Sequence, residues 1–314
     1  MSSINTNSSA MAALATLRNI NDDLGSTQNR ISSGLKVESG KDNAAYFQIS
    51  ETMKSDSSVY SSINEGLTIT KSSVSTARLG AESVQDLAQE FLDRVAFAQG
   101  ATSGLDEIEN DLNELVKSME TTLSQSTFNG DDMLGAGAYS DGDVTAATLD
   151  ATNGTFSAAA AQTDTAVGVD RNTVTGVSRA GGTYATTSIT VGTHDLGILV
   201  SDFKTIATNF GTNASDATNG AAFLSGVLAT TETTLSGVTD IATKLGQSEK
   251  SVETQQTFLQ AVVDNIDGSV GSMIDANMEE EAARLQALQV QQQLATQSLS
   301  IANQAPQNIL SLFR

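Results

Sequence analysis

Several residue types are missing or rare in this sequence of 314 residues. It contains no cysteine and no tryptophan, one histidine and one proline. Without cysteine, the chain can form no disulfide, no thiolate nucleophile and no thiolate metal site. Because proline interrupts helix interiors and central strands, its near absence permits long uninterrupted helices. With aromatic residues at 4%, the core must be built mainly from Leu, Ile, Val, Met and Ala.

Basic residues are also scarce: 16 Lys and Arg stand against 37 Asp and Glu, which gives a net charge of -21. A surface of this sign repels nucleic-acid phosphates and anionic lipids. The first residues lack the basic and apolar regions of a secretory signal, and no run approaches the ~18 apolar residues that a membrane helix needs. We therefore expect no nucleic-acid partner and no membrane insertion. The chain is expected to be cytosolic, or to be exported without a cleaved signal peptide.

Apolar residues recur every seven positions in both halves of the chain, a spacing typical of coiled-coil helices. Two such rows run between Ile63 and Ala98, and a second helix is predicted from Leu105 to Leu123 after a turn at 100–104. Another row runs from Leu245 to Met273, and both chain ends are amphipathic. The predicted fold is mainly α: a long coiled-coil-like helical bundle formed by paired N- and C-terminal segments.

The central region, from about 135 to 235, changes in character and is rich in Thr, Ala, Gly and Asp. Its stretch SITVGTHDLGILV alternates in a way that predicts strands, through Ile189, Val191, Leu196, Ile198 and Val200. We interpret this region as a small β-containing insertion. The only histidine, His194, lies in it and is predicted to be a solvated loop residue.

No pattern in the sequence indicates catalysis, a cofactor or a metal. A single histidine excludes the H-E-x-x-H metalloprotease helix. The three carboxylates of Glu279–Glu281 are typical of a helix start, where they face the positive end of the helix dipole. Asp131 and Asp132 follow a turn at Asn129-Gly130 and lack the spaced ligands of a calcium loop. We predict that the protein is not an enzyme.

The chain ends on ANQAPQNILSLFR, which holds the only proline and an apolar cluster. Pro306 is predicted to lie in the first turn of a short terminal helix, where its missing N–H costs little. Two thin terminal helices would leave much of their apolar surface open, and such a surface marks an interface. The predicted self-assembly core consists of Leu14, Leu17, Leu24, Ile31, Leu288, Leu299, Ile309, Leu312 and Phe313.

Four stretches together resemble the terminal motifs of bacterial flagellins, the subunits of the flagellar filament. They are INTNSSAMAAL near the start, RISSGLKVESGKDNAAYFQIS at 30–50, STFNGDDML at 126–134 and IANQAPQNILSLFR at the end. The resemblance covers roughly the first 135 and the last 80 residues. Many flagellins have glycine where this chain has Tyr46, a variant that is also found in the family.

The resemblance implies an architecture and a function. Residues 1–43 and 279–314 would form a terminal-helix inner-core domain, 44–134 and 236–278 a helical rod domain, and 135–235 a variable outer domain. The family is exported unfolded through the flagellar type III apparatus and polymerises into the extracellular filament used for swimming. The implied partners are other copies of the chain, an export chaperone, the filament cap and hook-associated proteins.

Two other classes of protein share some of these features. A hook–filament junction protein has terminal helices of the same kind and differs from a filament subunit in copy number. The cytoplasmic hairpin of a chemoreceptor is also acidic, rich in heptads and poor in proline, but it has a helical tip where this chain has a β-like insertion. We therefore keep a filament subunit as the first prediction and these two as alternatives.

Overall fold

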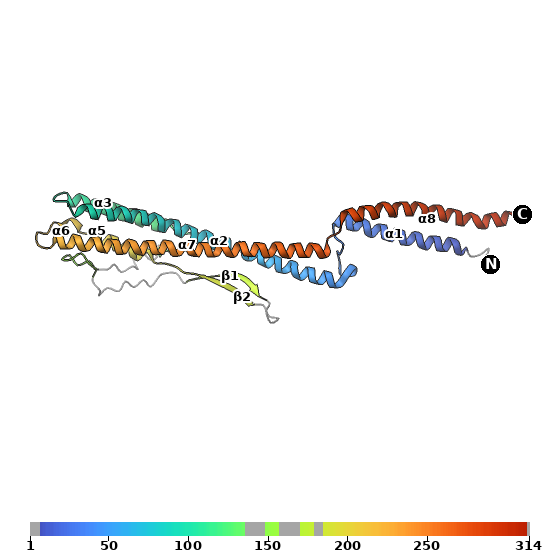
Figure 1. Ribbon diagram of the computed structural model, residues 1–314, viewed down its shortest axis with the longest axis horizontal. Coiled ribbons are helices and arrows are strands. Elements are labelled where there is room, and N and C mark those ends of the chain that lie inside the picture. Colours follow the sequence, from blue (N-terminus) through green and yellow to red (C-terminus); the bar gives the residue numbers. More distant parts are fainter. Residues whose placement is uncertain (1–6, 136–147, 157–169, 179–184, 313–314) are drawn as a thin grey trace. The chain divides into compact units, whose positions relative to one another are not determined.

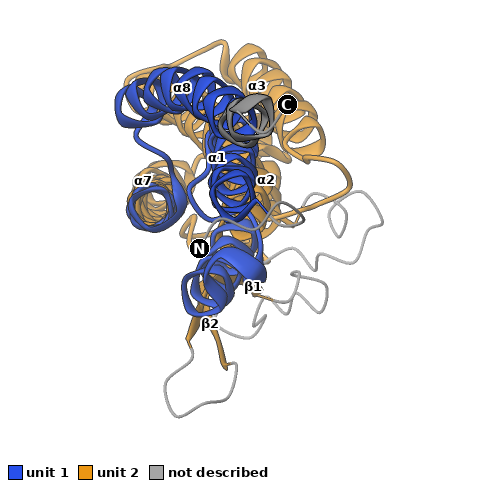
Figure 2. Cartoon of the chain, turned by 90° about the vertical axis from the view of Figure 1, so that its right-hand side faces the viewer, with its two compact units in different colours: residues 1–59, 262–314 blue, residues 60–261 orange. Residues whose placement is uncertain are grey.

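The structure is a computed structural model that describes residues 7–135, 148–156, 170–178 and 185–312. These residues contain seven helices and one antiparallel sheet of two strands. The chain divides into two compact units, coloured separately in Figure 2: unit 1 comprises 1–59 and 262–314, and unit 2 comprises 60–261. Each unit of those described residues joins segments from both halves of the chain, which agrees with the predicted pairing of N- and C-terminal segments. The finer division into three domains stays a prediction.

Unit 2 is built on long helices that lie side by side in Figure 1. Helix α2 (Gly40–Ala98) and helix α7 (Gly220–Ile274) contribute residues to both units, whereas α3 (Leu105–Gln125) belongs to unit 2 alone. Polar contacts join α2 to α7: the Gln256 side chain donates to Thr68 Oγ1 at 2.9 Å, and Arg78 Nε donates to Glu249 at 2.7 Å. Two short helices, α5 (Leu196–Ala207) and α6 (Phe210–Ala214), also belong to this unit.

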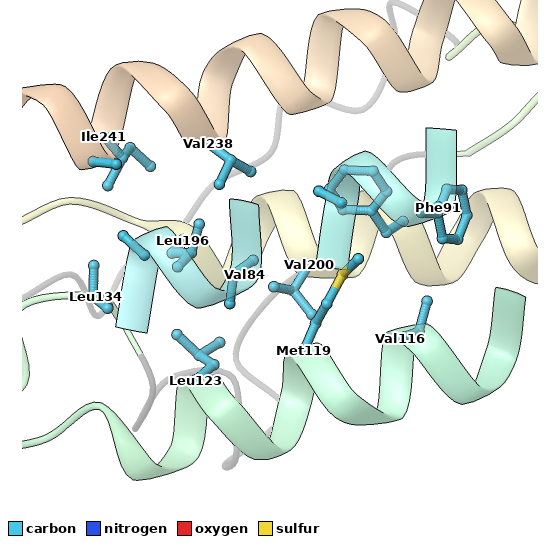
Figure 3. Close-up of a cluster of buried hydrophobic side chains, with 14 of the residues drawn as sticks. Val84, Phe91, Val116, Met119, Leu123, Leu134, Leu196, Val200, Val238 and Ile241 are labelled. Carbon is cyan, nitrogen blue, oxygen red and sulfur yellow. The ribbon is translucent and has the colours of Figure 1, made fainter. Parts of the chain in front are cut away.

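The predicted heptad rows form the core of unit 2. Figure 3 shows side chains of α2, α3, α5 and α7 pointing toward one another. The rings of Phe91 on α2 and Phe203 on α5 meet edge to face, with their centroids 5.0 Å apart. The predicted rows on α2 are closed off from solvent at Leu67, Val74, Ala77, Ala81, Val84, Ala88, Phe91, Val95 and Ala98. The predicted coiled-coil-like bundle is confirmed.

Both predicted turns occur where the sequence indicates them. Helix α2 ends at Ala98 and α3 begins at Leu105, after Gly104 with a φ of 78°. In the second turn, Asn129 and Gly130 have φ values of 51° and 79°. Such left-handed values suit glycine and asparagine. The backbones of Phe128 and Asp131 exchange two hydrogen bonds of 3.0 and 2.8 Å across this turn.

The central region contains the antiparallel hairpin of β1 (Arg171–Ser178) and β2 (Ala185–Val191), with Arg171 opposite Val191 and a bulge between Val174 and Gly176. Strand β1 is bound to the helices of unit 2. Tyr60 of α2 donates to the Val177 carbonyl, and Gln255 of α7 donates to the Thr175 carbonyl, both at 2.9 Å. The predicted β-containing insertion is confirmed in this form.

The strand prediction was wrong beyond Val191. Residues Leu196, Ile198 and Val200 lie in helix α5, whose first turn is capped by Asp195 accepting from the Ile198 N–H at 2.9 Å. The helix forms because a face at helical spacing, from Leu196 through Val200 and Phe203, is fully buried. Burial of this face outweighs the weak strand preference of β-branched residues. His194, just before α5, is half-buried rather than fully solvated, and the burial lowers its pKa.

Unit 1 contains the two terminal helices, α1 (Ser8–Ser33) and α8 (Met278–Leu312), with the adjoining parts of α2 and α7. Gly34 ends α1 with a φ of 73°, and its N–H donates to the Arg30 carbonyl. The next residues pair with the end of α7: Val37 N–H donates to the Ile274 carbonyl at 3.2 Å, and Ala276 N–H donates to the Gly34 carbonyl at 2.8 Å. These bonds join the exit of α1 to the entry of α8.

The prediction of a separate terminal helix beginning near Pro306 was wrong. Helix α8 continues from Met278 to Leu312, so Pro306 lies in its interior. A proline at such a position leaves the carbonyl four residues earlier without its N–H donor.

Candidate self-assembly site

Helices α1 and α8 lie side by side and run in opposite directions (Figure 1). Three polar contacts follow the pair from one end to the other. Asn7 Nδ2 donates to the Ala302 carbonyl at 2.8 Å, and Gln292 Nε2 donates to Asn21 Oδ1 at 2.7 Å. Arg30 Nη1 lies 3.2 Å from Glu281 Oε1. Because residue numbers rise on α1 while they fall on α8, the contacts define one antiparallel register.

Each helix of the pair begins and ends with residues suited to that position. Asn7 caps α1 by accepting from the Ala10 N–H at 3.0 Å, and Asn277 accepts from the Glu279 N–H at 3.2 Å at the start of α8. The first turn of α8 contains Glu279, Glu280 and Glu281, as predicted. Carboxylates here are favoured by the positive end of the helix dipole.

The Arg30–Glu281 ion pair was not predicted from the sequence. Arg30 lies in the last turn of α1 and Glu281 in the first turn of α8, so each charge also faces the helix dipole that favours it. The Glu281 side chain is only 8% exposed. Arg284 lies 4.0 Å from the same Glu281 oxygen, so two cations compensate this nearly buried carboxylate. Only the fold brings these residues together, since 251 positions separate them.

The facing sides of α1 and α8 form an apolar seam. Ile20 and Leu288 are buried at 8% exposure each. Four of the predicted core residues, Leu17, Leu24, Ile31 and Leu299, are half-buried, and Leu14 is 37% exposed. The side chains of Ile309 and Leu312, and the whole of Phe313, lie outside the described part of the chain. The role of all nine residues in self-assembly stays a prediction.

Helix α8 has a second apolar row on the side away from α1. Val290, Leu294 and Ile301 are 56%, 58% and 69% exposed. Spacings of four and seven residues place them on one face of a helix. The sequence analysis missed this row, although its helical spacing could have shown it. We call these three residues the open face of α8.

The open face is uncharged as well as apolar. No Asp, Glu, Lys, Arg or His occurs between Arg284 and Arg314, in a chain whose net charge is -21. Another surface that approaches this stretch of α8 therefore meets no charge on α8 itself. Contiguous exposed apolar surface is typical of interaction sites, which makes the open face a candidate for self-assembly.

Among the residues that the structure describes, no group of acidic or histidine side chains is arranged to hold a metal ion. No helix within the described ranges combines the length and apolarity needed to span a membrane.

Comparison with known proteins identifies the family. Residues 4–138 match the bacterial flagellin N-terminal helical region, and residues 228–313 match the bacterial flagellin C-terminal helical region. The chain belongs to the bacterial flagellin family. It is 35% identical to a flagellin of Brucella melitensis biotype 1, and also 35% identical to flagellin C of Rhizobium meliloti, with all of each chain covered. It is 27% identical to flagellin FljK of Caulobacter vibrioides, covering 100% of this chain and 99% of the relative.

Flagellins polymerise to form the filament of the bacterial flagellum, so this chain is a structural subunit of that filament. The family is structural rather than enzymatic. Each matched region contains one helix of the α1–α8 pair, so both helices of the pair lie in the parts of the chain that match the flagellin family.

Proposed function

We propose that the α1–α8 pair is the assembly element of this flagellin and that the open face of α8 binds a second copy of the chain. The observation that supports this most strongly is the row of Val290, Leu294 and Ile301, which is exposed, apolar and surrounded by uncharged sequence. Within one chain α1 covers the other side of α8. The open face needs a different partner to remove it from water, and burial of such a surface drives association.

The contact is heterologous, because the open face of one copy binds a different surface of the next. Repetition of a heterologous contact without closure produces a helical filament rather than a ring or dimer. Leu14, Leu17, Leu24, Ile31, Leu288 and Leu299 stabilise the helix pair in this proposal, and Ile309, Leu312 and Phe313 also contribute to self-assembly.

We further propose the three-part organisation of the subunit, with 1–43 and 279–314 as inner core, 44–134 and 236–278 as rod, and 135–235 as outer domain. We also propose export through the flagellar type III apparatus to the cell exterior, with a chaperone, the cap and hook-associated proteins as partners. One feature of the sequence supports this route: a chain without cysteine can pass a narrow channel with no crosslink.

A single charge on the open face tests the assembly proposal. Leu294→Asp puts a carboxylate into the contact, and an unpaired carboxylate is costly to desolvate. We expect the critical concentration for polymerisation to rise at least about a hundredfold, which corresponds to ~3 kcal/mol. Sedimentation of filaments formed from seeded monomers measures it.

The matched control is Gln289→Asp, which adds the same charge at an exposed position of the same helix outside the open face. Its critical concentration should change less than about threefold, since surface substitutions away from a contact are usually within ~0.5 kcal/mol. Equal effects of the two variants, or normal polymerisation of Leu294→Asp, would show that the open face is not the contact.

A further inference from the structure

The only proline of the chain leaves an acceptor vacant inside α8. In a regular helix the N–H of residue 306 would donate to the carbonyl of Ala302, four residues earlier. Pro306 has no N–H and so cannot make this bond. Helix α8 nevertheless continues to Leu312. Apart from the last turn, where every helix has unpaired carbonyls, Ala302 is the position in α8 at which the sequence removes the donor.

Asn7 of α1 supplies the missing donor. Its Nδ2 lies 2.8 Å from the Ala302 carbonyl oxygen, and its Oδ1 accepts from the Ala10 N–H at 3.0 Å. A carboxamide carries both donors and an acceptor, so one side chain caps α1 and bonds α8 at once. A carboxylate would cap α1 equally well but has no hydrogen to give Ala302.

The Ala302 carbonyl, which has no donor within α8, also specifies the point on α8 at which Asn7 binds. A slip of α8 by one residue would bring the carbonyl of Ile301 or Asn303 to Asn7. Those carbonyls have donors in their own helix, from the N–H groups of residues 305 and 307. The Asn7 contact therefore favours a single register, and it lies at the opposite end of the pair from the Arg30–Glu281 contact.

We propose that Asn7 is a positioning residue for filament assembly. Its side chain donates to the Ala302 carbonyl, which Pro306 leaves without a donor in α8, and this bond fixes the register of α1 against α8. This inference rests on the assembly role proposed for the helix pair. The fixed register determines which side of α8 is covered by α1 and which side is presented to a second copy. It gives the proline inside α8 a function: the helix loses one internal hydrogen bond, and the pair gains a site that recognises α1.

The test separates the two roles of Asn7. Asn7→Asp keeps the oxygen that caps α1 and removes the donor to Ala302. Loss of one hydrogen bond predicts a rise of about tenfold in the critical concentration for polymerisation of the full chain. Asn7→Ser, an uncharged capping residue, should show a rise of similar size and so controls for the charge of aspartate.

The decisive variant restores the missing N–H. In Pro306→Ala, the alanine N–H satisfies the Ala302 carbonyl within α8, so the donor of Asn7 is no longer needed. We therefore expect Asn7→Asp to have less than about a threefold effect in the Pro306→Ala background. Non-additivity of this kind is the signature of two residues that share one interaction. A role of Asn7 in capping alone would give the same cost in both backgrounds.

Two results would overturn the inference: normal polymerisation of Asn7→Asp, or an undiminished cost of Asn7→Asp beside Pro306→Ala. Either result would leave the assembly proposal standing if Leu294→Asp still blocks polymerisation. Normal filaments from Leu294→Asp would instead contradict the assembly role itself, whatever the Asn7 variants do. Far-UV circular dichroism of each monomer confirms that the helices form before polymerisation is compared.

Discussion

At the scale of single residues, Phe91 and Phe97 show how strongly the contribution of a side chain to stability depends on its position. Both lie on α2, but Phe91 is fully buried against Phe203, whereas Phe97 is 69% exposed. Phe91→Ala would leave a cavity in the core of unit 2, and such truncations cost ~3–5 kcal/mol. We expect the free energy of unfolding, measured in urea by circular dichroism, to fall by that amount.

Phe97→Ala is the matched control, since it makes the same change on the same helix at the surface. Its effect should stay within about 0.5 kcal/mol. A comparable loss of stability in the two variants would mean that the packing of α2 against α3 and α5 is not as described.

Residue patterns predicted local features better than long-range ones. The three glutamates of 279–281 indicated a helix start, and α8 begins there. The pairing of Glu281 with Arg30 could not be predicted, because neither local sequence indicates which residue 251 positions away will be its partner. The same holds for Asn7 and Ala302. Each half of that contact is visible in the sequence, as a capping residue and as a lone proline, but only the fold joins them.

At the scale of elements, the sequence predicted the helices whose apolar residues repeat regularly. Helix α3 and the parts of α2 from Ile63 and of α7 from Leu245 were found because a long heptad pattern has few alternative structures. The short helix α5 was misread because its apolar residues also alternate over five positions. The first part of α7 was read as part of the central region because it is rich in threonine, a weak helix former. In the helix, these threonines bond back to earlier carbonyls, as Thr231 does to Val227 at 2.8 Å.

The candidate site was predicted in part, because only some of its residues follow a regular apolar repeat. The seam residues on α1 and α8 follow a clear period, and Leu288 is buried in that seam. The open face of α8 was missed because the sequence analysis followed only the apolar row through Leu288 and Leu299. Apolar rows on two opposite sides of a helix suit two partners, and the chain itself supplies one of them.

The end of α8 gives an element-scale prediction. Deletion of Gln304–Arg314 removes the last turns of α8 together with Pro306, but none of the residues of unit 2. We expect the urea unfolding transition of unit 2 to be unchanged, while polymerisation is lost. Electron microscopy after seeding measures the second effect. A chain that lacks only Phe313 and Arg314 is the graded control, and normal filaments from the longer deletion would contradict the prediction.

At the scale of the whole molecule, assembly has to overcome charge. Each subunit has a net charge of -21, and self-repulsion of this size keeps separate copies in solution. The charge is unevenly placed, since the sequence between Arg284 and Arg314 has none. The uncharged stretch includes the open face of α8. Short-range apolar contact there can therefore operate only after copies have come close against a long-range repulsion.

Salt should weaken the repulsion between subunits but not the apolar contact between them, and this gives the last prediction. The screening length falls from ~30 Å at 0.01 M ionic strength to ~8 Å at 0.15 M. We expect the critical concentration for polymerisation to fall over this range, because repulsion between whole subunits is screened while the uncharged contact is not weakened. Sucrose at matched osmolality is the control, since it strengthens apolar burial without screening charge. A critical concentration that rises with sodium chloride would show that attractive ion pairs, rather than the uncharged face of α8, hold the subunits together, and a constant value would show that repulsion between subunits does not limit assembly.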